Sequence, residues 1–251
     1  MVPTGAPPPC LICCGPTSHR FALCFACRTL ARGLNLPLSP VLPAHLCPVT
    51  GPLYAVLMGY KESPIHEVRR RLAGRVLEQF AQLFATHRAC VVAAMGGGGV
   101  DIVLPVPSSS RPGPASLEGV EGLGELAVAS LGSGSSGATA RWMPAALGRA
   151  AGEIGHMRPN ARAFVVPRSA HACVSGARAL LLDDTYVSGS RAQSAAAALR
   201  LCGARAVLIV PVGRVLRPER FGAHAAFIAA RPGDEGHRSR CVLAQTRAGR
   251  R

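Results

Sequence analysis

The segment from residue 178 to residue 203 restricts the possible fold more than any other part of the chain. It contains the apolar run 179–182, which is followed by the acidic pair Asp183 and Asp184. A short, wholly apolar run is typical of a buried strand in a parallel sheet. The alanine-rich stretch that follows, closed by Gly203, predicts a helix from about Ser190 to Cys202. A strand followed directly by a helix is the repeating unit of α/β proteins.

The rest of the chain continues this alternation. Apolar residues recur every three or four positions between Ile65 and Phe84, which predicts one long amphipathic helix. Further strand-sized apolar runs, several of them separated by helix-length segments, lie at 89–95, 101–106, 163–166 and 206–212. We therefore expect an α/β fold with a parallel sheet flanked by helices.

Composition divides the chain into four parts. Residues 1–36 predict a cysteine-rich unit, residues 37–52 contain five prolines and predict an extended connector, and residues 53–230 hold the α/β domain. Residues 231–251 are basic and without periodicity, which predicts a disordered tail. Within the α/β domain, the Gly- and Ser-rich stretch 113–140 predicts an exposed loop or lid.

The cysteine-rich unit contains two Cys-x-x-Cys turns, Cys10-Leu-Ile-Cys13 and Cys24-Phe-Ala-Cys27. Each two-residue spacer brings its sulfurs to one side of a tight turn, so the pair of turns predicts a structural zinc site of four thiolates. Cys14 and His19 lie between the turns, and either could replace one ligand. Reduced structural cysteines and a redox pair are the alternative interpretations.

The charge and hydropathy of the chain limit its possible location and partners. The first residues lack the positive and apolar segments of a secretory signal, and no apolar run approaches the roughly 18 residues of a membrane helix. We therefore expect a cytoplasmic protein without membrane insertion. The net charge of +15 favours nucleic acid as a partner, but the arginines are scattered and aromatic residues make up only 4% of the chain.

The turn after the acidic pair predicts a phosphate site. Ser188-Gly189-Ser190 leads into the expected helix, whose first amides and positive dipole end suit a phosphate group. The two carboxylates of Asp183 and Asp184 can accept hydrogen bonds from vicinal hydroxyls such as those of a ribose. Together they predict a pocket for a 5-phosphorylated sugar. In the alternative interpretation, the acidic pair only caps the following helix.

The stretch Asp183-Asp184-Thr185-Tyr186-Val187-Ser188-Gly189-Ser190 resembles the phosphoribosyl-pyrophosphate (PRPP) loop of type I phosphoribosyltransferases. It departs from the family pattern at Val187 and Arg191, which stand where the family has hydroxyl residues. The order of the cysteine turns, Tyr60-Lys61, the strand Asp101-Ile-Val-Leu-Pro-Val-Pro107 and the PRPP loop is similar to the ComF-type, competence-related members of this family. The resemblance implies a type I phosphoribosyltransferase-like sheet with a small N-terminal zinc-binding unit.

The resemblance also implies a reaction and a set of roles. PRPP and Mg²⁺ would bind at Asp183, Asp184 and the residues of the PRPP loop, and the phosphoribosyl group would pass to a nitrogenous acceptor that the sequence does not identify. The pyrophosphate would face residues that follow the Pro-Val-Pro strand, namely Ser108, Ser109, Ser110 and Arg111. The alternative is a PRPP-sensing or single-stranded-DNA-associated accessory protein without turnover. Single-stranded DNA, the DNA-uptake machinery and a second copy of the chain remain open as partners.

Overall fold

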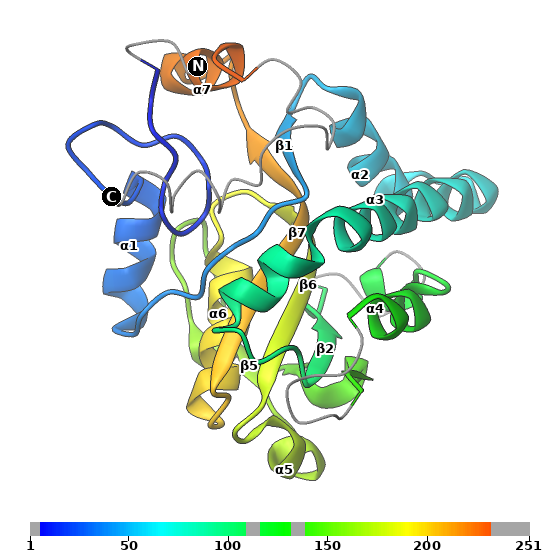
Figure 1. Cartoon of the computed structure of the whole chain (residues 1–251). Helices are drawn as coiled ribbons and strands as arrows, with labels where there is room; N and C mark the ends of the chain where they lie inside the picture. The colour runs from blue at the N-terminus through cyan, green and yellow to red at the C-terminus, as the bar shows by residue number, and fades with distance from the viewer. Residues whose placement is uncertain (1–5, 109–115, 132–138, 232–251) are drawn as a thin grey trace.

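Five parallel strands form the central sheet in the part of the chain that the computed structural model describes, residues 6–108, 116–131 and 139–231. Their order is β1 (His45–Pro48), β7 (Ala206–Leu216), β6 (Arg178–Tyr186), β2 (Ile102–Pro105) and β3 (Arg141–Trp142), and every neighbouring pair is parallel (Figure 1). The predicted α/β class and parallel sheet are therefore confirmed.

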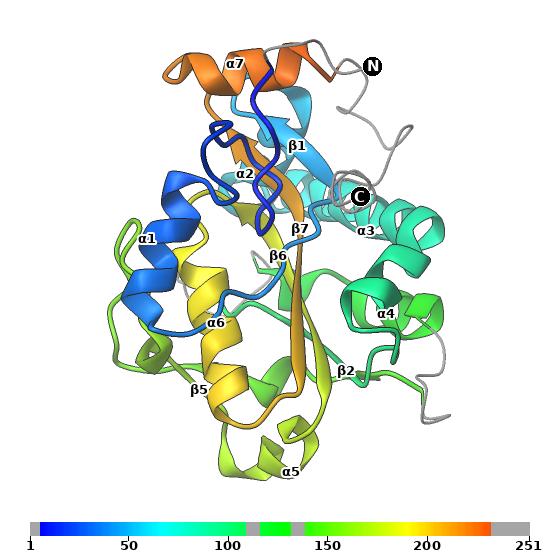
Figure 2. The same ribbon diagram turned by 60° about the vertical axis from the view of Figure 1, so that its left-hand side comes forward.

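Helices cover both faces of this sheet, because successive residues of its strands point to opposite sides. Leu180 and Leu182 of β6 belong to a core shared with α2 (Pro52–Glu62), α3 (His66–Ala94) and α4 (Leu123–Leu131). Ala179 and Leu181 belong to a second core, which contains α6 (Ser190–Leu201) and the cysteines around the start of α1 (Phe25–Leu34). Figure 2 shows the two layers on either side of β6 and β7.

Short elements complete the described chain. The strands β4 (Gly148–Arg149) and β5 (Phe164–Val165) pair antiparallel outside the main sheet. Two further helices, α5 (His171–Val174) and α7 (Gly222–Ala229), precede β6 and follow β7. Single 3₁₀ turns lie at η1 (Leu117–Gly119), η2 (Pro144–Ala146), η3 (Ala161–Ala163) and η4 (Arg168–Ala170).

Most of the predicted elements form as expected. The helix predicted from about Ser190 is α6, and the long amphipathic helix is α3, whose residues Val76, Phe80 and Leu83 are buried. The prediction of a strand at 89–95 is wrong, because α3 continues through this run to Ala94. A short apolar run has no period of its own, so sequence alone could not separate a strand from the buried end of a helix.

The segment 37–52, predicted as a connector, contributes to the sheet. His45–Pro48 form the edge strand β1, paired with β7, and Val41 forms an isolated parallel bridge with Ile209. Proline is compatible with an edge strand, where it removes no hydrogen bond of a central ladder. The cysteine-rich part also shares one buried core with α6 and the sheet.

Two further sequence predictions concern the Gly-rich stretch and the tail. The prediction of a loop over 113–140 is wrong for Leu117–Gly119 and Leu123–Leu131, which form η1 and α4 with Leu123 and Ala127 buried in the core. Apart from Arg231, the predicted basic tail 231–251 lies outside the described residues. Within the described residues, the structure contains no helix that could cross a membrane.

Candidate functional site

The predicted phosphate site lies where β6 passes into α6. Gly189 is the N-terminal cap of α6 and has φ of 87°, a left-handed conformation that glycine adopts without a steric penalty. A Cβ atom at this position would collide with the hydroxyl of Tyr186. The first amides of a helix have no intrahelical acceptor, so this turn presents donors at the carboxyl edge of the sheet.

A cavity of about 340 Å³ opens over this turn. Six of the residues predicted for the PRPP site line it: Asp183, Thr185, Val187, Ser188, Gly189 and Ser190. The other lining residues come from β4, from the segment after it and from the start of α6, namely Arg149, Ile154, Gly155, His156, Arg191 and Ala192. The structure therefore brings most of the predicted loop together around one cavity.

Two arginines also line this cavity. Arg149 lies over the ring of Phe164, 5.0 Å from its centroid, and Arg191 lies in the first turn of α6. Burial, and then the positive charge of Arg191, lower the pKa of Arg149. Two cations in one partly buried cavity favour an anionic ligand, which would offset their mutual repulsion.

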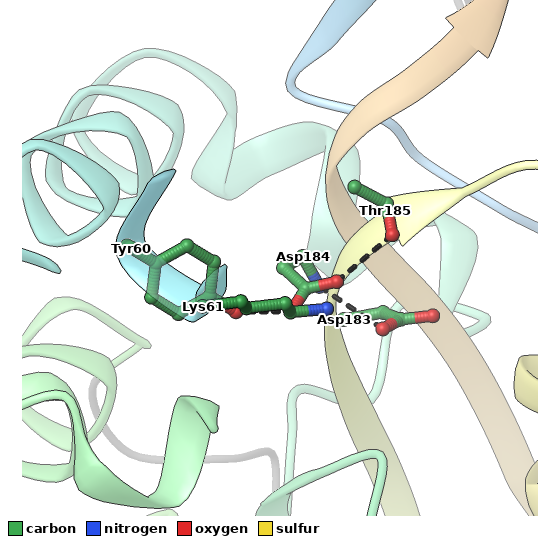
Figure 3. Close-up of polar contacts among 5 residues, drawn as sticks. All are labelled: Tyr60, Lys61, Asp183, Asp184 and Thr185. Atoms are coloured by element: carbon green, nitrogen blue, oxygen red, sulfur yellow. Dashed lines mark hydrogen bonds and ion pairs between the residues drawn. The ribbon is translucent and has the colours of Figure 1, made fainter. Parts of the chain in front are cut away.

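The carboxylate of Asp184 contacts residues of α2 (Figure 3) and is not among the groups that line the cavity. The hydroxyl of Tyr60 donates a hydrogen bond to its Oδ2, and Nζ of Lys61 lies 2.5 Å from the same oxygen. Thr185 Oγ1 donates to the other carboxylate oxygen at 3.0 Å. Burial, and then the charge of Asp184, raise the pKa of Tyr60, so this hydroxyl keeps its proton as the donor. Asp184 therefore ties the end of α2 to β6.

Asp183 is the acidic residue that faces the cavity. In Figure 3 its carboxylate points away from Tyr60 and Lys61, and its Oδ1 accepts the Asp184 amide at 3.0 Å. Burial and the neighbouring Asp184 charge raise the pKa of Asp183 to about 7, against the opposite effects of Lys61 and Arg191. A desolvated carboxylate beside a cavity gains most from a bound cation or from ligand hydroxyls.

The other predicted residues lie elsewhere. The Tyr186 side chain is 1% exposed and is buried in the core beneath α6, where its hydroxyl accepts a hydrogen bond from Gln193 Nε2 at 3.3 Å. Ser108 follows β2 at the same edge of the sheet but does not line the cavity. Ser109, Ser110 and Arg111, predicted for the pyrophosphate, lie outside the described residues.

The sequence analysis noted Tyr60-Lys61 only as part of the family-like order of motifs, and it predicted no contact for this pair, for Arg149 or for His156. A further signal was that Lys61 is the single lysine among 28 basic residues. Its contact with Asp184 spans more than a hundred residues and arises only when α2 packs beside the sheet. Arg149 and His156 lie in a stretch with no periodic pattern, so nothing local marked them as cavity residues.

The cysteine turns form a second candidate site. The sulfurs of Cys10, Cys13, Cys24 and Cys27 all lie within 4.8 Å of one another, and those of Cys13 and Cys24 are 3.7 Å apart. Four sulfurs around one zinc at about 2.3 Å would be about 3.8 Å apart, so the sulfur–sulfur distances of the cluster are close to those of a tetrahedral zinc site. The predicted four-cysteine set is therefore confirmed as a group that could hold a structural metal such as zinc.

The four thiols of the cluster act on one another through hydrogen bonds. Hydrogen bonds from Cys10, and then from Cys24 and Cys27, lower the pKa of Cys13 well below its usual value, whereas hydrogen bonds with Cys10 and Cys13 raise the pKa of Cys24 and of Cys27. The amide of Cys24 donates to the Cys10 sulfur at 3.3 Å. The two alternative ligands are not part of the cluster, because Cys14 directs its sulfur to the carbonyl of Val41 at 3.5 Å and His19 is exposed.

Comparison with known proteins adds no assignment to this geometry. No family model matches the chain, and a search of the curated proteins finds no match.

Proposed function

We propose that the protein binds PRPP with Mg²⁺ in the 340 Å³ cavity and transfers its phosphoribosyl group to a nitrogenous acceptor, with release of pyrophosphate. The observation that carries this proposal is the composition of the cavity. A glycine turn at a helix start, one desolvated carboxylate and two arginines surround the same space. These are the groups that a phosphorylated sugar with a diphosphate requires.

The 5-phosphate would lie on the turn at the start of α6. The amides that follow Gly189 and the hydroxyls of Ser188 and Ser190 supply neutral donors there. Arg191 adds a positive charge where the family resemblance leads us to expect a hydroxyl. A guanidinium binds phosphate more strongly than a neutral hydroxyl does, so this departure preserves anion binding.

Asp183 would accept hydrogen bonds from the ribose hydroxyls and contribute to a Mg²⁺ site. Magnesium, when bound, would neutralise the diphosphate charge and hold its oxygens together with a carboxylate. Asp184 contributes indirectly, because Lys61 and Tyr60 already occupy its carboxylate and hold β6 in place. Residues 108–111 remain the expected contact of the leaving pyrophosphate.

Phosphoribosyl transfer breaks the bond between C1 and the pyrophosphate oxygen and forms a bond between C1 and the acceptor nitrogen, which then loses its proton. The transition state carries positive charge at C1, so a fixed carboxylate near the ribose and cations at the diphosphate are the useful contributions of the protein. No covalent nucleophile is needed. Asp183, Arg149 and Arg191 can supply these charges from fixed positions around the cavity.

The Gly189→Ala variant tests this assignment. Alanine at φ of 87° is strained and its Cβ collides with the Tyr186 hydroxyl, so the turn must move. We expect the affinity for PRPP with Mg²⁺, measured by isothermal titration calorimetry, to fall about ten-fold or more. Gly176→Ala is the matched control, because Gly176 has φ of 75° and no atom within 4 Å of the added Cβ. Absence of PRPP binding to the wild type, or equal affinity in both variants, contradicts the proposal.

A second candidate function, association with single-stranded DNA, is favoured by a different surface. Three of the seven phenylalanines, Phe21, Phe25 and Phe221, are about half exposed or more and line one cavity of about 470 Å³ between the cysteine-rich part and α7. Arg28 lies over the Phe21 ring, 3.8 Å from its centroid. Exposed rings beside guanidinium groups bind nucleobases by stacking, without preference for sequence.

The Phe25→Ala variant tests this second candidate. Loss of one stacked base costs about 1–3 kcal/mol, so we expect the affinity for an oligodeoxythymidine to fall about ten-fold in a fluorescence anisotropy titration. Its salt dependence should stay unchanged, because no phosphate contact is removed. Leu201→Ala, which truncates an exposed apolar side chain on α6, is the control. Equal affinity of the two variants and the wild type would remove this surface as the binding site.

A further inference from the structure

A buried arginine connects the two candidate sites. Arg214 lies on β7 opposite Tyr186 of β6 and is 5% exposed. Its Nη1 donates hydrogen bonds to the carbonyls of Tyr186 at 3.0 Å, Val187 at 2.8 Å and Val215 at 2.8 Å. Two of these three carbonyls belong to the segment that leads into the phosphate turn. The guanidinium therefore holds the backbone of that segment through its carbonyl groups.

This contact fixes the direction of two amides. The described chain contains no cis peptide bond, and in a trans peptide the C=O and the following N–H point in opposite directions. When Arg214 holds the carbonyls of Tyr186 and Val187, the amides of Val187 and Ser188 must point away from the guanidinium. Val187 and Ser188 both line the 340 Å³ cavity. Two successive amides directed to one side form a concave site for an anion.

The other side of the same guanidinium adjoins the cysteine cluster. A Cβ atom placed on Gly15 would lie 2.8 Å from Nη2 of Arg214, so the guanidinium is packed against the backbone that follows Cys13 and Cys14. Gly15 is two residues from Cys13 in the chain, so the buried guanidinium lies beside the part of the backbone that carries one sulfur of the cluster. Four thiolates around one divalent ion carry a net charge of about −2, and a buried charge of that size requires a nearby cation.

We propose that Arg214 is a positioning residue that makes phosphate binding in the cavity depend on metal bound at the cysteine cluster. The charge of the metal–thiolate group holds the guanidinium in place, and the guanidinium in turn holds the Tyr186 and Val187 carbonyls. The dependence of PRPP binding on the cluster rests on the proposed function of the cavity. The coupling between the cysteine cluster and the turn at the start of α6 does not rest on that function.

The Gly15→Ala variant displaces the guanidinium without changing it, and Arg214→Lys keeps the charge but removes the planar fork that serves several carbonyls. In both variants we expect about one zinc per chain, as in the wild type, and an affinity for PRPP with Mg²⁺ about ten-fold lower. Gly222→Ala is the control for the first variant, because no atom lies within 4 Å of its added Cβ. Arg28→Lys is the control for the second, because Arg28 donates to the Leu23 carbonyl in the cysteine-rich part.

A third measurement tests the coupling without PRPP. Hydrogen exchange at the amides of Val187 and Ser188 should speed up about ten-fold when zinc is stripped from the wild-type protein. In Arg214→Lys the exchange should already be fast and change little on stripping, since coupled effects do not add. The amides of β2, which share a buried core with the cysteines, follow the general loss of stability on stripping, so the changes at Val187 and Ser188 are measured relative to them.

The outcomes separate the two proposals. A wild-type protein that does not bind PRPP, but shows the zinc-dependent exchange, overturns the proposed function and supports the coupling. If Gly15→Ala and Arg214→Lys bind PRPP as tightly as the wild type does, the coupling alone is overturned. Zinc removal that changes the exchange of the wild type and of Arg214→Lys equally also overturns it.

Discussion

A Cys24→Ser variant is expected to lose the metal and much of its stability. Cys24 has two roles, because its sulfur belongs to the four-cysteine cluster and also accepts the amide of Cys27 as the N-terminal cap of α1. Serine can act as a cap but is a poor zinc ligand. Structural zinc supplies about 10–16 kcal/mol of binding free energy in small domains, so we expect a loss of at least about 3 kcal/mol of unfolding free energy.

This loss should extend beyond the cysteine-rich part. The four cysteines belong to the same buried core as Val41, Tyr186 and the inner face of α6. We therefore expect a lower melting temperature of the whole protein by circular dichroism, together with loss of about one zinc per chain by elemental analysis. Cys14→Ser is the control, because Cys14 is also buried and lies outside the cluster. A wild-type protein that is folded without metal, or a Cys24→Ser variant that retains zinc, would contradict the assignment.

The two adjacent acids are expected to respond to substitution in opposite ways. Asp183→Asn removes the carboxylate that faces the cavity, so PRPP affinity with Mg²⁺ should fall about ten-fold or more, a change of about 1.4 kcal/mol. Asp184→Asn leaves Lys61, whose side chain is 25% exposed, without its counter-charge. This variant should lose about 2 kcal/mol of unfolding free energy, since one partner of a partly buried ion pair remains.

The pH dependence of stability separates the two roles further. Burial raises the pKa of Asp183 from its ordinary value of 3.8 to about 7. The folded protein therefore favours the protonated form of Asp183. The contribution of this group to the free energy of unfolding is fully present below about pH 4 and is lost as the pH rises through 7. Asparagine does not titrate, so Asp183→Asn should gain melting temperature over the wild type at pH 8, and this gain should shrink toward pH 4. The measurement is a thermal melt in magnesium-free buffer.

Several results would contradict this division between the acids. Equal PRPP affinity in the wild type and Asp183→Asn would remove Asp183 from the site. An unchanged melting temperature of Asp184→Asn would show that the Tyr60 and Lys61 contacts contribute nothing to stability. Lys61→Met is a useful companion to Asp184→Asn, because it removes the other partner of the same ion pair.

Local sequence patterns predicted the parts of the fold that depend on neighbouring residues. The run 179–182, the acidic pair and the glycine turn lie together in the chain, so the strand β6, the turn and helix α6 could be predicted correctly. The cysteine set could be predicted because each Cys-x-x-Cys turn defines its own geometry. These signals require no knowledge of which elements meet.

Contacts between distant segments could not be predicted in the same way. The pairing of β1 with β7 joins residues 45–48 to residues 213–216, and prolines in the first segment concealed a strand at the sheet edge. The two acids look equivalent in the sequence, yet only packing of α2 beside β6 brings Lys61 to Asp184 and leaves Asp183 at the cavity. The role of Arg214 likewise depends on the registry of β7 against β6.

Lys61 carries the only ε-amino group of the whole chain. An amine-directed dye or isotope label will therefore attach at one side chain besides the N-terminus, without any engineered residue. That side chain lies 2.5 Å from the Asp184 carboxylate, so its reactivity reports whether the end of α2 remains attached to β6. Reductive methylation with an isotope-labelled methyl group keeps the positive charge of Nζ, so a label introduced in this way would follow the loosening or tightening of this attachment in solution and in real time.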